Sequence, residues 1–518
     1  MGGGKSLIHI KAQNPAARHG GDQYHLKECI MIPMIPTLTR RSFIATTALT
    51  AASLGLSRGA WAATHQPLLL TATSRTLDID GRAATVWGLV NAQGGSGLTL
   101  DPGQRFRVDL TNALDEDTII HWHGQIPPNA QDGVPDIPQP MLKPGEMRAF
   151  DFEPMPGTYW MHSHVPVQEM QMLAAPLIVR SAADLTADRQ EVVMFLHDFS
   201  FRPAAEVLAE ITGGDGSMAG MDMGPATPAP DAPTGMDMAG MHMSGAAMDL
   251  NDFNFDAYLA NDRTLNDPEV IRVDNGGRVR LRVINAAAAT VFWIDTGAVQ
   301  ARLVAVDGHD VQPLPGRRFG LAMGQRLDIE LDLPAGEGAF AVLALREGAV
   351  ERTGIILATA GATIEKLAGT GDTAAAAFDT DLSQEAALRA MTPLPDRPAD
   401  TAAILMLGGS MQPYLWTING QTWGNHTPIT AKSGQRVEVS FHNMSMMAHP
   451  MHLHGHGFQV VAINGKRFAG AVRDTVQVPP MAMVTIAVDA GEAARWMLHC
   501  HHMPHLSTGM MTEFAVSA

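Results

Sequence analysis

The sequence predicts an all-β protein made of antiparallel sandwiches or barrels. Short apolar or alternating runs recur through the chain, and Gly, Pro, Asn and Asp separate them. Long helical periodicity is scarce, and the Ala-rich stretch 382–390 is the best candidate for a short helix. The 518 residues are 46% hydrophobic and 17% charged, which suffices for about two to four domains with separate cores.

The expected strands fall into three groups along the chain. Examples are 105–110, 157–161, 176–179, 279–284, 302–306, 326–331, 437–441, 458–463 and 483–488. Two composition breaks separate or interrupt the groups: 211–250 has eight Met, eight Gly, four Pro and no aromatic residue, and 360–398 is rich in Ala and Thr. We therefore predict domains at 63–185, 186–365 and 395–518, with a Met-rich insertion at 211–250 and a linker at 366–394.

The N-terminus has the features of a targeting segment. Arg40 and Arg41 form a twin-arginine pair, an apolar run follows at 43–56, and an A-x-A cleavage site ends at Ala62. The apolar run is shorter than the ~20 residues that a membrane span needs. We predict that residues 1–62 are a leader for twin-arginine export, and that the mature protein is soluble and periplasmic.

Charge and cysteine content exclude several classes of protein. Lys and Arg number 36 against 53 Asp and Glu, a formal net charge of -17, which argues against nucleic-acid binding. The apolar fraction is too high for a disordered acidic chain. Removal of the leader would remove Cys29 and leave only Cys500, so a disulfide framework is not expected.

Four histidine clusters carry the chemistry. Ten of the 21 histidines lie in them: His121, His123, His162, His164, His449, His452, His454, His499, His501 and His505. Within H-x-H on a strand, both imidazoles lie on one face because side chains alternate with a period of two. Two such strands can bring four nitrogens together. Imidazole binds Cu, Zn, Fe and Ni alike, so the histidines do not select the metal.

Cys500 selects copper. A thiolate, two imidazoles and a weak axial Met form the trigonal blue-copper site. Cys500, His505 and Met510 follow one another at spacings of five, which places three ligands on one loop, with His449 available as the fourth. Zinc is disfavoured because ten histidines exceed the four ligands of one tetrahedral site.

This pattern resembles the multicopper oxidases, the family of laccases and bacterial copper oxidases. The resemblance is densest in HWHGQIPPNAQDGVPDIPQPMLKPG, PGTYWMHSH, HPMHLHGHGF and HCHHMPHLSTGMM, and it extends over the mature chain. It implies three cupredoxin-like Greek-key sandwiches, a type 1 copper in the last, and a three-copper cluster between the first and the last. Electrons from a reductant would pass from type 1 copper to the cluster, which reduces dioxygen to two waters.

Carried over residue by residue, the resemblance assigns twelve ligands to four copper ions. The type 1 ligands are His449, Cys500, His505 and Met510; the type 2 ligands are His121 and His452; the type 3 ligands are His123, His162, His164, His454, His499 and His501. The neighbouring His456 and His502 do not match ligand positions, and we expect them near the ligands or on the surface.

Proton delivery departs from the family pattern. Asp132 matches an acidic residue that the family places within the first motif, so we predict a catalytic role for it. The carboxylate that many bacterial members carry after the last type 1 histidine is Leu506 here, and the fungal one is Met503. Glu513, Asp474 or water molecules are open alternatives for the missing proton donor.

The reductant depends on the methionines. The stretch 217–248 holds eight Met, whose soft thioethers select Cu(I), and Gly, Pro and Asp around them oppose a packed core. Cuprous-ion oxidation in copper tolerance is therefore our preferred function, with a laccase acting on phenols or aromatic amines as the alternative. For Met170, Met172, Met446 and Met447 we favour core packing. Dioxygen is the second substrate, and we expect a monomer.

Overall fold

The computed structural model describes residues 66–214 and 250–518. The predicted leader and residues 215–249 of the predicted insertion lie outside the described residues. The all-β prediction is confirmed, since each of the nine expected runs coincides with a strand. The stretch 382–390 contains α4 (Ser383–Ala387), as predicted.

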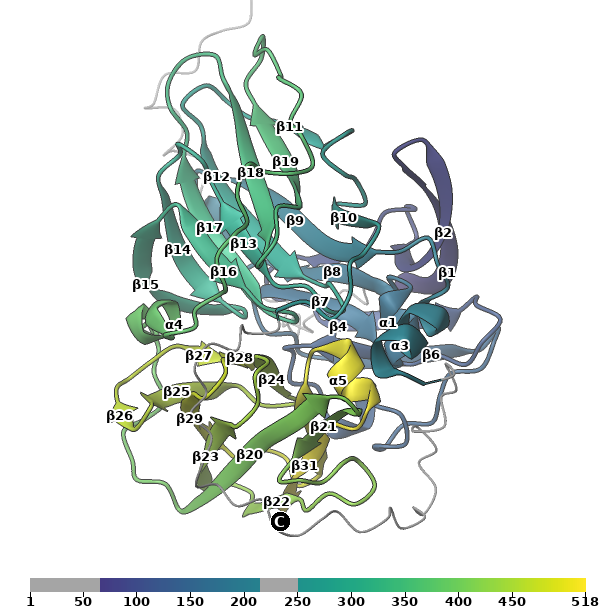
Figure 1. The fold of residues 1–518 in the computed structure, drawn as a ribbon, viewed down its shortest axis with the longest axis vertical. Coiled ribbons are helices and arrows are strands. Elements are labelled where there is room, and N and C mark those ends of the chain that lie inside the picture. The colour runs from purple at the N-terminus through teal and green to yellow at the C-terminus, as the bar shows by residue number, and fades with distance from the viewer. Residues whose placement is uncertain (1–65, 215–249) are drawn as a thin grey trace, which may run out of the picture. The chain divides into compact units, whose positions relative to one another are not determined.

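The first pair of sheets comes from the N-terminal third of the described chain (Figure 1). Its strands are β1 (Leu68–Ile79), β2 (Arg82–Asn91), β3 (Leu98–Leu100), β4 (Phe106–Asn112), β5 (Ile120–His123), β6 (Met147–Phe152), β7 (Gly157–Ser163) and β8 (Ala174–Val179). They are ordered β2-β1-β4-β6 and β3-β8-β7-β5. Phe106 of one sheet packs edge-on against Trp122 of the other, with centroids 4.8 Å apart, in a shared core.

The second pair of sheets is the middle one. Its strands are β9 (Gln190–Phe199), β10 (Ala257–Ala260), β11 (Val270–Arg272), β12 (Arg278–Asn285), β13 (Phe292–Asp295), β14 (Ala301–Val306), β15 (His309–Gly316), β16 (Arg318–Leu321), β17 (Arg326–Asp332), β18 (Ala339–Arg346) and β19 (Arg352–Ala358). The orders are β10-β9-β12-β17-β14-β15 and β11-β19-β18-β13-β16. Inward residues such as Phe292 and Ile329 belong to one apolar core.

The third pair is C-terminal. Its strands are β20 (Thr401–Met411), β21 (Tyr414–Ile418), β22 (Ile429–Lys432), β23 (Arg436–Asn443), β24 (His449–Leu453), β25 (Phe458–Ile463), β26 (Lys466–Arg467), β27 (Val472–Arg473), β28 (Thr475–Val478), β29 (Met483–Asp489), β30 (Arg495–Cys500) and β31 (Met511–Ser517). The orders are β21-β20-β23-β29-β25-β26, with β27 on β25, and β22-β31-β30-β24-β28. This core includes Cys500 and Met510.

The three sheet pairs share one pairing pattern. In each, the first long strand pairs in parallel with a later strand, β1 with β4, β9 with β12 and β20 with β23. In each second sheet a short strand pairs in parallel with the last one, β3 with β8, β11 with β19 and β22 with β31. Such crossovers between otherwise antiparallel strands are typical of Greek-key sandwiches. The exact domain boundaries stay a prediction.

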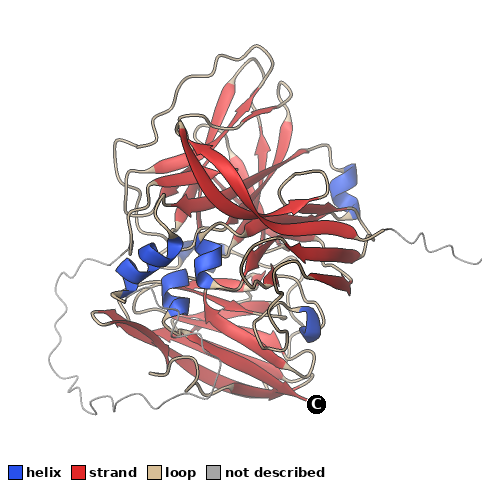
Figure 2. Ribbon diagram, turned by 90° about the vertical axis from the view of Figure 1, so that its right-hand side faces the viewer, coloured by secondary structure: helices blue, strands red, loops and turns tan. Residues whose placement is uncertain are grey.

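Several short helices connect the strands. Besides α4, they are η1 (Asn129–Gln131), α1 (Pro166–Met170), α2 (Ala182–Thr186), α3 (Ala204–Thr212) and α5 (Met503–Ser507). Helices α1, α3 and α5 contact one another, and they lie together in the ribbon (Figure 2). No helix within residues 66–214 and 250–518 is long and apolar enough to cross a membrane.

Buried arginines of the middle and last sheet pairs join all three cores. Arg326 of β17 is fully buried, and it donates to the Thr158 carbonyl oxygen at 3.2 Å and to Asp474 Oδ1 at 2.8 Å. Arg473 donates to Asp307 Oδ2 at 2.9 Å. Because these residues belong to strands, or to the turns directly next to strands, of different sheet pairs, the contacts fix the first and last pairs against the middle one.

Candidate metal centre

Strand register brings the H-x-H motifs face to face. On the paired strands β5 and β7, His121 lies opposite His162. On β24 and β30, His452 lies opposite His499. All ten predicted histidine ligands are buried. The expectation that pairs of strands deliver several imidazoles to one place therefore matches the geometry.

The imidazoles converge in three groups between the first and third sheet pairs. His121 Nε2 lies 3.5 Å from His452 Nε2, His123 Nδ1 lies 3.4 Å from His162 Nε2, and His454 Nε2 lies 3.1 Å from His499 Nε2. His501 joins the group of His123 and His162, and His164 joins that of His454 and His499; in each group the donor atoms lie within 4.8 Å of one another. These eight histidines are those predicted for the type 2 and type 3 coppers.

Hydrogen bonds to the opposite ring nitrogens fix which nitrogen faces the centre. Backbone carbonyl oxygens lie 2.8–3.0 Å from Nδ1 of four ligands, namely His121, His162, His452 and His499. His454 Nδ1 lies 2.8 Å from Asp132 Oδ2. Such contacts orient an imidazole and increase its basicity as a ligand.

Asp474 contacts two of the predicted ligands at once. Its Oδ1 lies 3.2 Å from His123 Nε2, and its carbonyl oxygen lies 2.9 Å from His452 Nδ1. Burial alone would raise the pKa of Asp474, but the charge and hydrogen bonds of Arg326, with those of the two histidines, bring it well below its usual value. Asp474 is therefore a carboxylate anchored by Arg326.

The predicted type 1 donors form a compact triangle. His449 Nδ1 lies 3.1 Å from His505 Nδ1, and Cys500 Sγ lies 3.7 Å and 3.5 Å from these two nitrogens. Met510 is buried, and its backbone bonds to both Cys500 and His505. Three of the predicted type 1 ligands thus lie at the end of β30 and on the turn that leads to β31.

Burial keeps the imidazoles in the form that binds metal. Loss of solvation is the largest cause that lowers the pKa of nine of them: His123, His162, His164, His449, His452, His454, His499, His501 and His505. The pKa of His449 falls to about 3. Burial raises the pKa of the Cys500 thiol. Because metals bind thiolate and neutral imidazole, metal binding at Cys500 releases a proton.

The donor sets fit metal ions. An ion about 2.0–2.3 Å from each donor, with angles between tetrahedral and trigonal, separates the donors by about 3.3–3.7 Å. The type 1 distances of 3.1, 3.5 and 3.7 Å are close to this range. His164 Nε2 and His501 Nε2 are buried without a hydrogen-bond partner among the described residues, and a bound ion would satisfy both.

Three family models, each described as multicopper oxidase, match residues 71–184, 232–362 and 396–518. The chain belongs to the multicopper oxidase family. It is therefore a copper-dependent oxidoreductase that uses dioxygen as electron acceptor. The resemblance noted in the sequence and the cupredoxin-like fold are confirmed.

Relatives of this multicopper oxidase include copper-resistance proteins and laccases. Multicopper oxidase MmcO of Mycobacterium tuberculosis is 30% identical over 459 residues, covering 86% of each chain. A copper resistance protein A homolog of Pseudomonas syringae pv. tomato is 25% identical and covers 93% of this chain and 100% of its own. The structure of a laccase from Botrytis aclada, 22% identical, has a TM-score of 0.68 and covers 86% of this chain and 87% of its own, a likeness that shows the fold.

The acidic residues considered from the sequence lie in different surroundings. Asp132 is 1% exposed and bridges two groups of histidines, with Oδ2 on His454 and Oδ1 3.5 Å from His121 Nδ1. Glu513 binds the Arg495 guanidinium. The position of Asp132 suits the predicted catalytic role, which stays a prediction.

Sequence reasoning missed two buried carboxyl groups. Glu169 of α1 places Oε2 2.8 Å from His162 Nδ1, and burial, reinforced by Asp198, raises its pKa well above the usual value. Asp252 accepts a hydrogen bond from the Tyr414 hydroxyl, and burial raises its pKa to about 6. The available signal for Glu169 was its place five residues after an H-x-H motif; for Asp252 the sequence offered none.

The remaining predicted residues lie close to the ligands. His456 Nδ1 is 3.0 Å from the His454 carbonyl oxygen, and the His502 ring stacks on His505 with centroids 3.9 Å apart. Met172 and Met447 are buried in apolar clusters, and Met170 packs against a third cluster. These positions agree with the expected core packing. Met446 is half-buried.

Proposed function

We propose that this chain binds four copper ions and couples oxidation of a small reductant to reduction of dioxygen to two waters. The proposed ligands are those given above: four for type 1, two for type 2 and six for the type 3 pair. Support comes from the separate donor groups, each buried and compact enough for one ion. The copper ions supply the one-electron chemistry and dioxygen reduction.

The protein's part in electron transfer is a short covalent path. Cys500 of the type 1 triangle is bonded through the backbone to His499 and His501, which belong to different histidine groups of the cluster. All three side chains are fully buried from bulk solvent. Asp132 contacts His121 in one histidine group and His454 in another. We propose that it carries protons beside the type 2 copper.

Cuprous ion is the reductant that we propose. The observation that supports this choice is that other side chains cover the His505 imidazole. His505 is fully buried. Its Nε2 lies 3.8 Å from Asp252 Oδ2, and His502 stacks on its ring at an interplanar angle of 16°. A phenol ring has no direct access to this imidazole, whereas an electron from a small ion can pass through His502.

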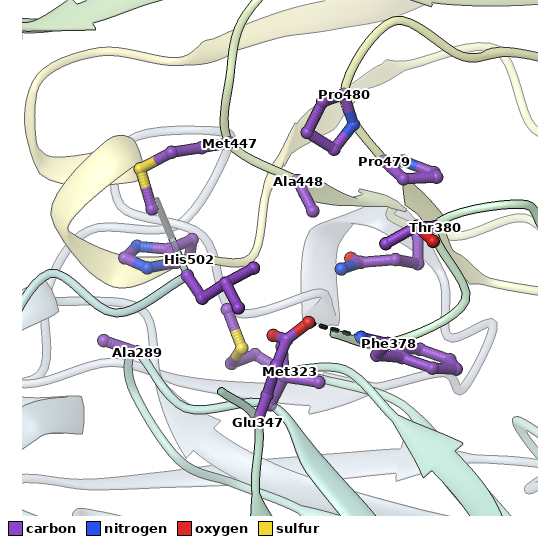
Figure 3. A pocket seen from close by; sticks show the side chains of 13 residues that line it. Ala289, Met323, Glu347, Phe378, Thr380, Met447, Ala448, Pro479, Pro480 and His502 are labelled. Atoms are coloured by element: carbon purple, nitrogen blue, oxygen red, sulfur yellow. Dashed lines mark hydrogen bonds between the residues drawn. The ribbon is translucent and has the colours of Figure 1, made fainter. Parts of the chain in front are cut away.

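A small cavity beside His502 suits a soft ion. It has about 20 Å³ of room, enough for one water-sized occupant. Met323, Met447 and His502 are among its lining residues and face the same space (Figure 3). His502 Nδ1 is buried without a hydrogen-bond partner among the described residues. Thioether and imidazole donors favour Cu(I).

The Met-rich sequence is attached next to this cavity. Leu250, the first described residue after it, lines the cavity. On its other side, Ile211 of α3 packs against the core that contains Cys500. Helix α3 also contacts α5, the helix that carries His505, so both attachment points lie near α5, although the insertion belongs to the middle part of the sequence. This placement supports a role of its eight methionines in supplying Cu(I).

We further propose that the protein is exported and acts as a periplasmic monomer in copper tolerance. The twin-arginine pair Arg40-Arg41 supports export. Relatives named copper resistance protein A, which this chain matches over 80–93% of its length, support the role. Fractionation of expressing cells, with Arg40→Lys and Arg41→Lys together as the control that blocks export, tests the location.

Oxygen uptake with Cu(I) and with a phenol tests the choice of reductant. Deleting 216–248 should raise the KM for Cu(I) by about tenfold, equivalent to about 1.4 kcal/mol, and leave the blue colour intact. The matched control keeps the insertion at its full length and changes its eight methionines to serine: Met218, Met221, Met223, Met236, Met238, Met241, Met243 and Met248.

A substitution in the cavity tests the contribution of the cavity to Cu(I) oxidation separately from that of the insertion. Met447→Leu keeps the volume but removes a soft donor, so Cu(I) oxidation should fall while phenol oxidation does not change. The laccase function replaces our proposal if the 216–248 deletion and Met447→Leu both oxidise Cu(I) as well as the wild type does, and if phenols are the better reductant.

A further inference from the structure

The third sheet pair carries a row of soft donors on one outer face. The strands β20, β23 and β29 are neighbours in one sheet. Met406 of β20 pairs with His442 of β23, and His442 pairs with Met483 of β29. The adjacent Phe441 and Val484 belong to the apolar core. Because side chains alternate along a strand, the row Met406, His442 and Met483 lies on the face turned away from that core.

Side chains on this face meet across the strands. Ser440 Oγ lies 2.9 Å from Thr485 Oγ1, and His442 and Met483 are the next pair on the same face. Residues opposite each other on neighbouring strands have Cβ atoms about 4.5–5.5 Å apart. Because a methionine side chain is unbranched and flexible, a sulfur atom on either side of His442 can turn toward the imidazole. One ion can therefore contact the imidazole and a thioether together.

Two further methionines extend the row. Met444 follows His442 by two residues and is 37% exposed, and Met481 precedes Met483 by two residues and is 62% exposed. The other three residues, Met406, His442 and Met483, are partly exposed. We call these five residues the Met/His patch. All five are accessible from solvent, unlike the buried donors of the copper centres.

The chemistry of the Met/His patch favours a soft ion. Among the described residues, no hydrogen bond, ion pair or ring contact engages the His442 side chain. The patch contains no carboxyl group, and Glu438, four residues before His442 on the same face of β23, pairs with Arg467. Thioethers select Cu(I), whereas carboxylates and carbonyls suit Mg, Ca and Mn. A single imidazole also falls short of the four ligands typical of zinc.

The strands that carry the patch lead into the cavity beside His502. The segment after β23 supplies Met447 and Ala448 to the cavity lining, and the turn before β29 supplies Pro479 and Pro480. These four residues border the same space (Figure 3). The Met/His patch therefore lies on the same two strands whose ends reach the cavity.

We propose that the Met/His patch is a surface binding site for Cu(I), with the His442 imidazole and the flanking thioethers as ligands, and that the ion passes from it to the cavity beside His502. The ion keeps its oxidation state during this transfer. Binding at the patch needs none of the four copper ions, whereas the use of the transferred ion as reductant rests on the proposed function.

The binding test titrates Cu(I) into the fully reduced holoenzyme under argon, in competition with bicinchoninate. The background has the eight methionines of the insertion changed to serine. In it, Met406→Leu with Met483→Leu removes both flanking sulfurs and keeps the side-chain volume. This double variant should bind one Cu(I) equivalent fewer than the background. The control Met391→Leu removes a methionine that is 59% exposed and lies outside the patch, and it should bind as many as the background.

A spectroscopic test identifies the ligands in the wild-type chain. Methionine methyl groups are labelled with ¹³C, and Ag(I) serves as the probe because the enzyme does not oxidise it. The methyl signals of Met406 and Met483 should shift when Ag(I) is added, and His442→Gln should reduce this response. The signal of Met391 should stay in place, and Zn(II) should move none of the three signals.

Oxygen uptake tests the transfer to the cavity. In the double variant, the KM for Cu(I) should rise by about tenfold, the low end of the loss expected when a group that supports a metal site is changed. Phenol oxidation and blue absorption should equal the wild-type values, because the double variant leaves the proposed copper ligands in place.

Four results would overturn the proposal. They are equal numbers of bound Cu(I) in the double variant and the background, the same loss in Met391→Leu, methyl signals of Met406 and Met483 that do not respond to Ag(I) or respond equally to Zn(II), and an unchanged KM for Cu(I). Failure of the proposed function would look different: the wild type would consume no oxygen with Cu(I), although the patch would still bind Ag(I).

Discussion

Removal of the Arg326 side chain should destabilise the protein and loosen the cluster. Arg326 is fully buried and contacts Asp474, Thr158 and Gly324. Arg326→Gln leaves the Asp474 carboxylate buried without its cation. Breaking a buried pair in this way costs about 3–5 kcal/mol. Asp474 in turn holds His123 and His452, and loss of such an outer contact lowers metal affinity by about 10–100-fold.

Two assays check this prediction against a matched variant. The free energy of unfolding of the copper-free protein is measured in urea, and copper retention is measured in competition with a chelator. Arg467→Gln removes an arginine–carboxylate pair of the same chemistry with Glu438, but Arg467 is 62% exposed, so the cost should stay below about 1 kcal/mol. If the two variants lose equal stability and retain copper equally, Arg326 does not hold the cluster in the way that we infer.

Three further predictions concern the copper sites and Glu347, a carboxyl group that lines the cavity beside His502. Cys500→Ser should abolish the blue absorption and the oxidase activity but keep the copper bound by the cluster histidines; blue absorption after copper loading would contradict the thiolate assignment. Met510→Leu should raise the type 1 potential, because an axial thioether stabilises Cu(II); a redox titration that shows no change or a decrease would exclude Met510 as the axial ligand. Burial raises the pKa of Glu347 from 4.5 to about 7, so the folded state keeps a proton that the unfolded state loses. Stability should therefore fall by up to about 3 kcal/mol as the pH rises from 4.5 to 7, and Glu347→Gln should remove this part of the pH dependence in urea unfolding; an unchanged slope would show that the carboxyl group is not the cause.

Local patterns in the sequence predicted what depends on local geometry. An H-x-H motif on a strand fixes the relation of two imidazoles, and the spacing of Cys500, His505 and Met510 fixes one loop. Alternating apolar runs predicted strands, because one face of each strand must enter a core. The family motifs then predicted which clusters combine. These features rely on contacts over a few residues, or on a pattern that the whole family shares.

Contacts made across the fold could not be read from the sequence. Glu169 Oε1 lies 3.9 Å from His501 Nδ1, and its helix α1 packs against α5, over 300 residues further along the chain. Asp252 covers His505 through a similarly distant contact, and its neighbours in sequence show no periodicity that would place it there. The same holds for Arg326 and Asp474, 148 residues apart. Side chains of this kind are placed by tertiary packing, which no short window of sequence records.

The order of ligands along the chain has a consequence for biosynthesis. Each of the four ligand groups takes at least one member from the segment between His449 and His505, and His121 and His452 are 331 residues apart. Before residue 449 is synthesised, a growing chain therefore holds only four of these histidines, at 121, 123, 162 and 164. None of the four proposed ligand groups is complete before residue 452, and three of them also need residues in the segment 499–510. A full set of proposed ligands therefore needs almost the whole chain, and a premature stop anywhere before residue 449 removes at least one member of every group.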